Sequence, residues 1–198
     1  LPVLCKHNDP VNGELYQPLS VTPPVFANIA ENVYMFSGQE PKQITVFVKA
    51  GKANIQGSVA LKLPQGWRSE PAAIPFQIDT DQAEQTANFS LYPPANASEA
   101  EIQAIVNLDG KDYSKGINVI NYNHIPVQVL FPGATAKVVK LDLIKKGSKI
   151  GYLMGAGDEV PRSLQQIGYE VTLLKDADVN TENLARFDAV ITGVRAYN

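Results

Sequence analysis

Apolar and polar side chains alternate along several short segments between residues 17 and 134. A two-residue period is typical of β-strands that bury one face and expose the other. The segments place apolar side chains at Ile44, Val46 and Val48; Ile55, Val59, Leu61 and Leu63; Ala87, Phe89 and Leu91; Ile102, Ala104, Val106 and Leu108; and Ile125, Val127, Val129 and Phe131. Several short strands at this rhythm predict an antiparallel, immunoglobulin-like β-sandwich over residues 17–134, preceded by a lead-in segment at 1–16.

Turn-forming residues separate the predicted strands, and no segment of this region repeats at helical spacing. The turns fall at residues 38–41, Gly51-Lys52, Gln65-Gly66, Pro93-Pro94 and Asp109-Gly110. Glycine and proline at these places support the division into short strands.

The pattern changes after residue 147. Residues 149–154, 169–174 and 188–193 are compact apolar runs of strand length. A short helix is predicted after the first run, where Val160, Leu164 and Ile167 repeat at helical spacing, and a second helix carries Leu184 and Phe187. Gly168 marks the end of the first helix, and Asn180 or Thr181 caps the second. This order predicts a partial flavodoxin-like α/β (βαβαβ) unit with parallel strands over residues 148–198.

Two features of this arrangement leave alternatives open. Residues 135–147 are either a linker or an extra edge strand, and residues 138–144 suit the last sandwich strand or an added strand of the parallel sheet. Doubly wound sheets normally continue past a third strand, and an uncovered apolar edge favours association. We therefore expect either a segment of a longer protein or a chain whose edge strand pairs with another copy.

Charge and composition exclude several classes of function. A net charge of −3 argues against nucleic-acid binding and against a polybasic membrane surface. No apolar run approaches the ~20 residues of a membrane span. Cys5 is the only cysteine, and His7 and His124 are the only histidines, so neither an internal disulfide nor a metal site is expected. We predict no metal and no cofactor.

The turn Gly155-Ala-Gly157-Asp158 lies between a predicted strand and a predicted helix, where doubly wound folds bind phosphate. The dinucleotide fingerprint requires a third glycine, but Val160 occupies that position. The carboxylate of Asp158 would also repel a phosphate. A structural turn with Asp158 as helix cap is the favoured interpretation, and a small-ligand or nucleotide site is the alternative.

Other polar residues near this turn allow two interpretations. Asp158 and Glu159 suit acid/base chemistry or, more simply, a favourable interaction with the helix dipole. Arg195, Tyr197 and Asn198 follow the third strand, at the sheet edge where α/β folds bind ligands. No Gly-x-Ser-x-Gly nucleophile motif occurs, and we predict no catalytic residue in this chain.

Aromatic residues of the predicted sandwich suggest a carbohydrate site. Trp67, with Tyr92 and Tyr34, suits a platform for sugars, although a single tryptophan at a hairpin more often fills a core. Asn88 and Asn96 stand in short glycosylation acceptor patterns.

Several stretches resemble a known protein family. They are residues 6–18, KHNDPVNGELYQP, with residues 21–24, VTPP; His124-Ile-Pro126; residues 149–161, KIGYLMGAGDEVP; and residues 188–198, DAVITGVRAYN. Together they resemble the region downstream of the catalytic domain in large bacterial LmbE/PIG-L family deacetylases, notably those of the Bacteroidetes type. The likeness covers nearly the whole chain and is strongest at its ends.

In that family, a zinc-dependent N-acetylglucosaminyl deacetylase domain precedes a sandwich like that attached to some α-galactosidases. A class I glutamine amidotransferase-like (flavodoxin-like) domain follows. The zinc motif His-Pro-Asp-Asp does not occur here, and the amidotransferase nucleophile would lie beyond Asn198, so no catalytic residue transfers.

The resemblance implies a non-catalytic accessory region of an extracytoplasmic sugar deacetylase, although the first residues carry no signal peptide. Such a region would position the catalytic domain, or dock substrate or a partner. The alternatives are a carbohydrate-binding sandwich and a ligand site at the α/β switch point. The expected partner is a glycan or another domain of the same polypeptide.

Overall fold

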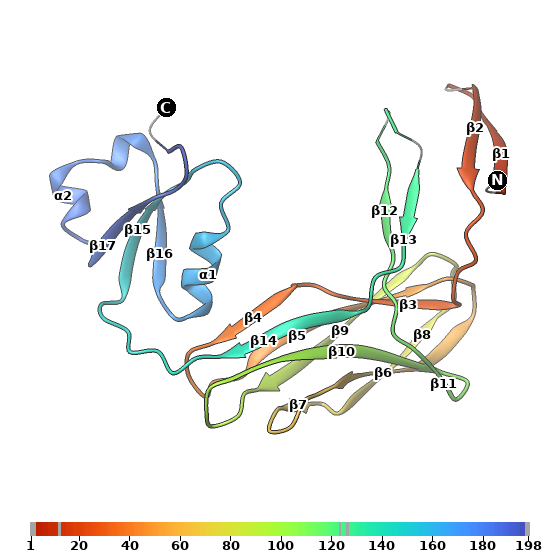
Figure 1. Ribbon diagram of the computed structural model, residues 1–198, viewed down its shortest axis with the longest axis horizontal. Helices are drawn as coiled ribbons and strands as arrows, with labels where there is room; N and C mark the ends of the chain where they lie inside the picture. The colour runs from red at the N-terminus through yellow and green to blue at the C-terminus, as the bar shows by residue number, and fades with distance from the viewer. Residues whose placement is uncertain (1–2, 12, 123, 126, 197–198) are drawn as a thin grey trace. The chain divides into compact units, whose positions relative to one another are not determined.

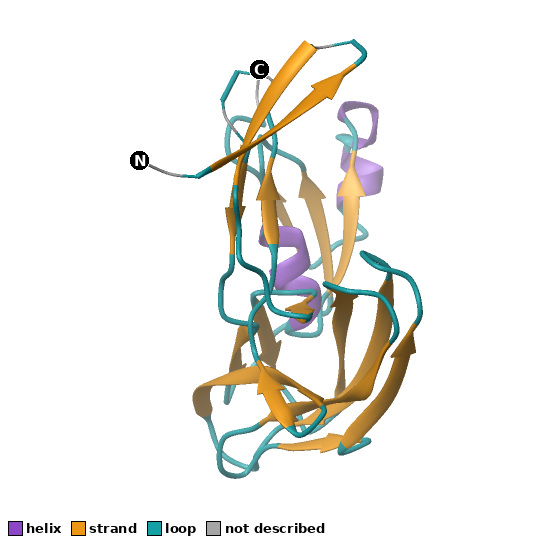
Figure 2. Cartoon of the chain, turned by 90° about the vertical axis from the view of Figure 1, so that its right-hand side faces the viewer, coloured by secondary structure: helices purple, strands orange, loops and turns teal. Residues whose placement is uncertain are grey.

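The computed structural model describes residues 3–11, 13–122, 124–125 and 127–196. Strands account for most of this backbone and helices for a small part (Figure 2). The chain divides into two compact units, which are residues 1–32, 41–92 and 101–137, and residues 33–40, 93–100 and 138–198. No helix of the described residues is long and apolar enough to cross a membrane.

Two mostly antiparallel sheets form the predicted β-sandwich (Figure 1). The first has the strand order β4 (Val33–Phe36), β14 (Thr135–Lys140), β10 (Ser98–Leu108), β6 (Ile55–Lys62) and β8 (Ala73–Ile78). A sixth strand, β11 (Lys111–Tyr113), also pairs with β10. The second has the order β3 (Val25–Ile29), β5 (Lys42–Ala50), β9 (Glu84–Tyr92), β7 (Arg68–Glu70).

The sandwich core consists of the alternating apolar columns that the sequence predicts. Residues with no exposed area include Val25, Ile44, Val46, Ala50, Val59, Phe89, Leu91, Ile102, Ala104, Val106 and Val138. Neighbouring strands keep these columns in register, as in the pairing of Ile44 with Phe89. Because the side-chain period of a strand is two residues, a shift of one residue would turn each column towards solvent. The β-sandwich prediction is therefore confirmed.

The prediction is wrong for the segment at residues 125–131. Among the described residues of this segment, only β13 (Gln128–Leu130) is a strand, and it pairs with β12 (Asn118–Ile120) as a separate two-stranded ribbon. Val127, Val129 and Phe131 alternate with exposed residues but are only half-buried. The apolar period is thus present, and at its end the ring of Phe131 stacks on Phe26 of β3, with 5.9 Å between the ring centroids.

The lead-in segment also contains a hairpin that was not predicted. Strands β1 (Leu4–Asp9) and β2 (Gly13–Pro18) pair antiparallel, with Asp9 opposite Gly13. Gly13 has a φ of +76°, in the left-handed region that glycine adopts without strain. The Asn12-Gly13 dipeptide is the sequence signal for this turn, although Asn12 lies outside the described residues.

Residues 135–147, which were predicted as either a linker or an extra edge strand, consist of a strand followed by a segment without a strand. Residues Thr135–Lys140 form β14, a strand of the sandwich, and residues 141–147 contain no strand. The three-stranded parallel sheet gains no strand from this segment. The interpretation as a last sandwich strand therefore holds for its first part.

Residues 149–192 form a three-stranded parallel sheet with β15 (Lys149–Leu153) between β16 (Glu170–Leu174) and β17 (Ala189–Thr192) (Figure 1). The helix α1 (Val160–Gln166) connects β15 to β16. The 3-10 helix η1 (Asp176–Asp178) and α2 (Thr181–Leu184) connect β16 to β17. The predicted strands and helices are present, but α2 ends at Leu184, so Phe187 follows the helix instead of lying on it. Two such short helices do not establish a flavodoxin-like fold, which stays a prediction.

Candidate functional site

The loops that follow β15 and β17 meet at the carboxyl edge of the parallel sheet. Gly193 N donates to Leu153 O at 2.8 Å, and Ala156 N donates to Val194 O at 3.1 Å. A Cβ atom on Gly155 would overlap the backbone of Val194, and one on Gly193 would overlap Gly155. The chain's own backbone therefore occupies the place between the two strands where open α/β sheets bind ligands.

Asp158 connects this loop to the core of the sheet. The hydroxyl of Tyr152, a residue only 1% exposed, donates to Asp158 Oδ2. Val160 N donates to Asp158 Oδ1 at 3.1 Å. Burial, followed by the hydrogen bond to the Asp158 carboxylate and the charge of that carboxylate, raises the pKa of Tyr152 to about 12. Both carboxylate oxygens of Asp158 thus have structural partners.

The start of α1 differs by one residue from the prediction. Glu159, not Asp158, is the N-cap, and its side chain makes no capping hydrogen bond. The helix has seven residues, with Pro161 in its first turn. Gly157 has a φ of +64°, and a Cβ there would meet nothing within 4 Å. The predicted glycine turn thus has the geometry of a tight structural turn with Asp158 folded back on the sheet.

The remaining candidates at this edge are dispersed. Glu159 and Arg195 are exposed. Arg195 has a φ of +60°, which is uncommon for a residue with a Cβ. Tyr197 and Asn198 lie outside the described residues. The structure brings Gly155 and Asp158 next to Gly193, and leaves Glu159 and Arg195 as solvent-facing loop residues.

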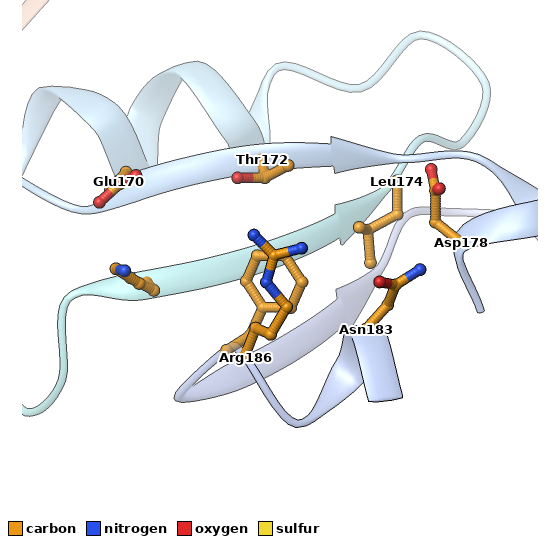
Figure 3. Close-up of a pocket in the computed structure, with 8 residues that line it drawn as sticks. Glu170, Thr172, Leu174, Asp178, Asn183 and Arg186 are labelled. Carbon is orange, nitrogen blue, oxygen red and sulfur yellow. The ribbon is translucent and has the colours of Figure 1, made fainter. Parts of the chain in front are cut away.

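A pocket of about 220 Å³ lies on one face of the same sheet (Figure 3). It is lined by Lys149, Glu170, Thr172, Leu174, Asp178, Asn183, Arg186 and Phe187. Figure 3 shows Glu170, Thr172 and Leu174 in a row along β16, with Asp178 and Asn183 beyond the end of the strand. Lys149 is the parallel partner of Glu170, so it belongs to the same face of the sheet.

The floor of the pocket is apolar because β15 has a glycine at its centre. A Cβ on Gly151 would lie 2.8 Å from Leu174 Cδ1 and 3.0 Å from Phe187 Cδ2. Leu174 is 8% exposed, and Phe187 is half-buried. The missing side chain of Gly151 therefore lets Leu174 and Phe187 pack against β15.

The formal charges of the residues that line the pocket sum to zero. Lys149 and Arg186 supply two positive charges, and Glu170 and Asp178 supply two negative charges. Asp178 Oδ2 also accepts a hydrogen bond from the backbone N–H of Lys175 at 2.9 Å. The lining contains no histidine and no cysteine. The pocket therefore suits a protein surface or a ligand that carries both positive and negative groups.

The sequence analysis missed this pocket because its residues form no motif. They come from two strand starts, a helix, a 3-10 helix and a loop. The one signal is on β16, where Glu170 and Thr172 are polar residues at alternate positions of a segment that was predicted as an apolar strand.

The proposed aromatic platform is not assembled. Trp67 and Tyr34 are each 6% exposed, which favours the core interpretation of Trp67. Tyr92 lies 3.9 Å beneath the Arg68 guanidinium, measured to the ring centroid. Its hydroxyl donates to Glu70 Oε2 at 3.0 Å. These rings therefore pack against protein groups rather than towards a sugar.

Among the residues that the structure describes, no group of three or more His, Cys, Asp and Glu side chains converges on one point. His124 stacks on Tyr122, with 5.8 Å between the ring centroids.

Comparison with known proteins gives little further information. No protein-family model matches the chain, and no curated protein matches it. Among solved structures, the chain is similar to WR4, a member of the C. elegans MSP family, at 9% sequence identity and a TM-score of 0.32. The similarity covers 59% of this chain and 98% of WR4. A TM-score of this size supports no assignment of fold or function.

Proposed function

We propose that this chain is a non-catalytic accessory region of an extracytoplasmic LmbE/PIG-L-type sugar deacetylase. In this proposal, the parallel-sheet unit is the beginning of a flavodoxin-like, glutamine amidotransferase-like domain and docks against another domain of the same polypeptide. The sequence resemblance at residues 6–18, 21–24, 124–126, 149–161 and 188–198 supports the family. The surface of the parallel-sheet unit supports the docking.

The observation that carries the docking proposal is the exposure of apolar side chains on and beside the parallel sheet. Leu173 is 55% exposed, Val190 is 43% exposed and Val194 is 69% exposed. Val190 lies on the same face as the pocket residue Thr172, because both are register partners of Gly151. Leu173 is the register partner of Tyr152 and therefore lies on the opposite face from Val190. The docking surface that we propose is the face of Val190 and Thr172, because exposed apolar surface on a sheet is typical of interaction sites.

The edge of the sheet adds to this surface. In the described part of the chain, β17 has one neighbouring strand, β15. Its residues Ala189-Val-Ile-Thr192 include no proline and no charge, which are the usual protection of an edge strand. An edge of this kind suits the addition of a strand from a protein partner.

The pocket residues fit the same role. A protein interface commonly combines an apolar centre with a rim of charged and polar groups. Lys149, Arg186 and Glu170 surround the apolar floor formed by Leu174 and Phe187. The balanced charge favours a protein surface over a phosphate or another simple anion.

Hydrogen exchange on the full-length protein and on the 198-residue chain tests the docking. We expect the amides of β17 to be much better protected in the full-length protein, because a docked segment covers the edge. The amides of β9, inside the sandwich, serve as an internal reference and should exchange alike in both. Equal exchange of β17 in the two proteins would contradict the proposal.

A pair of matched variants sharpens this test. Val190 and Val33 are strand residues of similar exposure, at 43% and 41%. In the full-length protein, Val190→Lys should abolish the extra protection of β17, whereas Val33→Lys should leave it intact.

The family itself is tested by the reading frame upstream of Leu1. The proposal requires an N-terminal domain with a His-Pro-Asp-Asp motif and zinc-dependent deacetylase activity. A full-length protein without that motif would refute the family assignment, and the docking result would stand independently.

A further inference from the structure

Two cavities of the sandwich lie outside the site described above. The first has a volume of about 270 Å³ and is lined by Lys52, Asn54, Ile55, Gln56, Gln77, Asp79, Leu108 and Asp109. Three parts of the sandwich converge on it: the loop between β5 and β6, the end of β8, and the turn between β10 and β11.

The second cavity has a volume of about 680 Å³ and is lined by Gln56, Gly57, Pro75, Phe76, Gln77 and Gln85. It shares Gln56 and Gln77 with the first cavity. These two glutamines are direct register partners on β6 and β8. The cavities therefore adjoin along this glutamine pair and form one groove, which we call the β6–β8 groove.

Gln85 shows why the sandwich is open along the second cavity. It continues the inward column of Ala87, Phe89 and Leu91 on β9, and its register partner is Val48. Val48 is 1% exposed, but Gln85 is exposed. A polar residue thus stands where an apolar core residue would close the gap between the two sheets.

The turns hold the polar groups of the groove in defined positions. Asp109 has a φ of +51° and Asn54 a φ of +54°, both in the left-handed region that Asn and Asp adopt more readily than most residues. Gln77 Nε2 donates to Asp79 Oδ1 at 3.0 Å. Asn54 N donates to the backbone oxygen of Asp79 at 3.2 Å, which ties the two loops together.

The chemistry of the lining matches a carbohydrate. Side-chain amides both donate and accept hydrogen bonds, and carboxylates accept them, which is the combination that sugar hydroxyls require. Ile55, 2% exposed, and Leu108, 4% exposed, belong to the sandwich core, so the exposed lining of the first cavity is polar. The two volumes are comparable with the range of about 300–1,000 Å³ found for small-molecule sites.

The formal charge of the residues that line the first cavity favours neutral sugars over acidic ones. Asp79 and Asp109 outweigh Lys52 around the first cavity, so a uronate or a phosphate would meet net repulsion. We propose that the β6–β8 groove binds a neutral hexose oligosaccharide through Gln56, Gln77 and the loop carboxylates. This function is separate from the docking of the parallel-sheet unit and does not depend on it.

Titration of the chain with cellotetraose and with maltotetraose tests the proposal, with calorimetry for affinity and amide chemical shifts for location. At least one of the two sugars should bind and shift the side-chain amide signals of Gln56 and Gln77. Substitution of either glutamine by alanine should weaken binding about tenfold, as expected when a sugar loses its hydrogen-bonding partner. Tetragalacturonate should bind more weakly than the neutral sugars.

Gln43→Ala is the matched control, because Gln43 is an exposed strand glutamine that lines neither cavity. This variant should bind as the wild type does. Unfolding curves of all three variants check that the sandwich remains folded.

Several results would overturn the proposal. One is the absence of binding by both neutral tetrasaccharides up to about 10 mM. Another is binding that survives in both glutamine variants, which would place the sugar elsewhere. A third is a response of Asp79 and Asp109 to Ca²⁺ alone without any response to sugar, which would make the groove a cation site.

Discussion

The sandwich and the parallel sheet contain similar apolar residues but bury them to very different degrees. In the sandwich, alternate side chains are almost completely buried from Ile44 to Ala50 on β5, from Ala87 to Leu91 on β9 and from Ile102 to Leu108 on β10. In the parallel sheet, Ile150, Tyr152 and Leu174 are buried, while Leu173 is 55% exposed and Val190 is 43% exposed. Both regions satisfy the backbone hydrogen bonds between their strands, so the difference lies in what covers the sheet faces.

This difference shows that an apolar period predicts a strand more reliably than it predicts burial. In the sandwich, each sheet covers the inner face of the other, so the core needs nothing else. In the parallel sheet, two short helices cover only part of the faces. The remaining apolar surface is available for interaction, and the two regions should therefore respond differently to the same substitutions.

The largest expected effect is in the sandwich core. Leu91 has no exposed area, and Leu91→Ala should lower the free energy of unfolding by about 2–5 kcal/mol, because the substitution leaves a cavity. Leu173→Ala, at a strand position that is 55% exposed, should cost about 1 kcal/mol or less. The single tryptophan, Trp67, is buried in the sandwich, so its fluorescence reports sandwich unfolding in urea.

If Leu91→Ala and Leu173→Ala shifted the urea midpoint of the Trp67 fluorescence transition equally, the contrast between the two regions would be wrong. This result would mean that Leu173 supports the sandwich as strongly as a core residue does. No shift by Leu91→Ala would instead mean that the sandwich core relaxes around the lost side chain.

A smaller effect is expected at the loop contact of the parallel sheet. Gly193→Ala places a Cβ against Asp158 Oδ2 and Gly155, which should cost about 1–3 kcal/mol because two backbone segments must separate. Gly38→Ala is the matched control, since its Cβ would meet only Glu40 N at 4.0 Å. Amide exchange of β15 measures the effect. Similar protection of β15 in both variants would show that the loop contact is not needed.

Most of the sandwich and the order of strands and helices after residue 147 were predictable from the sequence. Alternation indicated the buried columns, and Gly168 and Asn180 marked helix boundaries that the structure confirms. These features depend on local spacing and local capping. The hairpin at β1 and β2 was also predictable in principle from Asn12-Gly13.

The candidate sites were much less predictable, because side chains that are distant in sequence form them. Trp67 was a candidate for its residue type, but packing places it in the core. The β6–β8 groove depends on the register of Gln56 with Gln77 and on Gln85 standing in an inward column. No local pattern contains that information, since register is set between strands.

The smallest expected effect concerns a polar contact that holds the start of the parallel sheet. Asp188 Oδ2 accepts hydrogen bonds from Ser148 N at 2.7 Å and Lys149 N at 2.9 Å. The bond from Lys149 N, followed by that from Ser148 N, lowers the pKa of Asp188. The folded state therefore favours the ionised carboxylate. The resulting stabilisation is complete above the pKa of the unfolded chain and is lost as the pH falls through the folded pKa.

Asp188→Asn should consequently lower the melting temperature at neutral pH, and the difference from the wild type should shrink on acidification. Melting curves between about pH 7 and about pH 2 measure this difference. Asp81→Asn is a suitable control, because Asp81 is an exposed aspartate whose side chain bonds only to the adjacent Gln82 among the described contacts. A difference that stays constant with pH would mean that the charge of Asp188 is irrelevant. The parallel sheet would then depend on apolar packing alone, as the sandwich does.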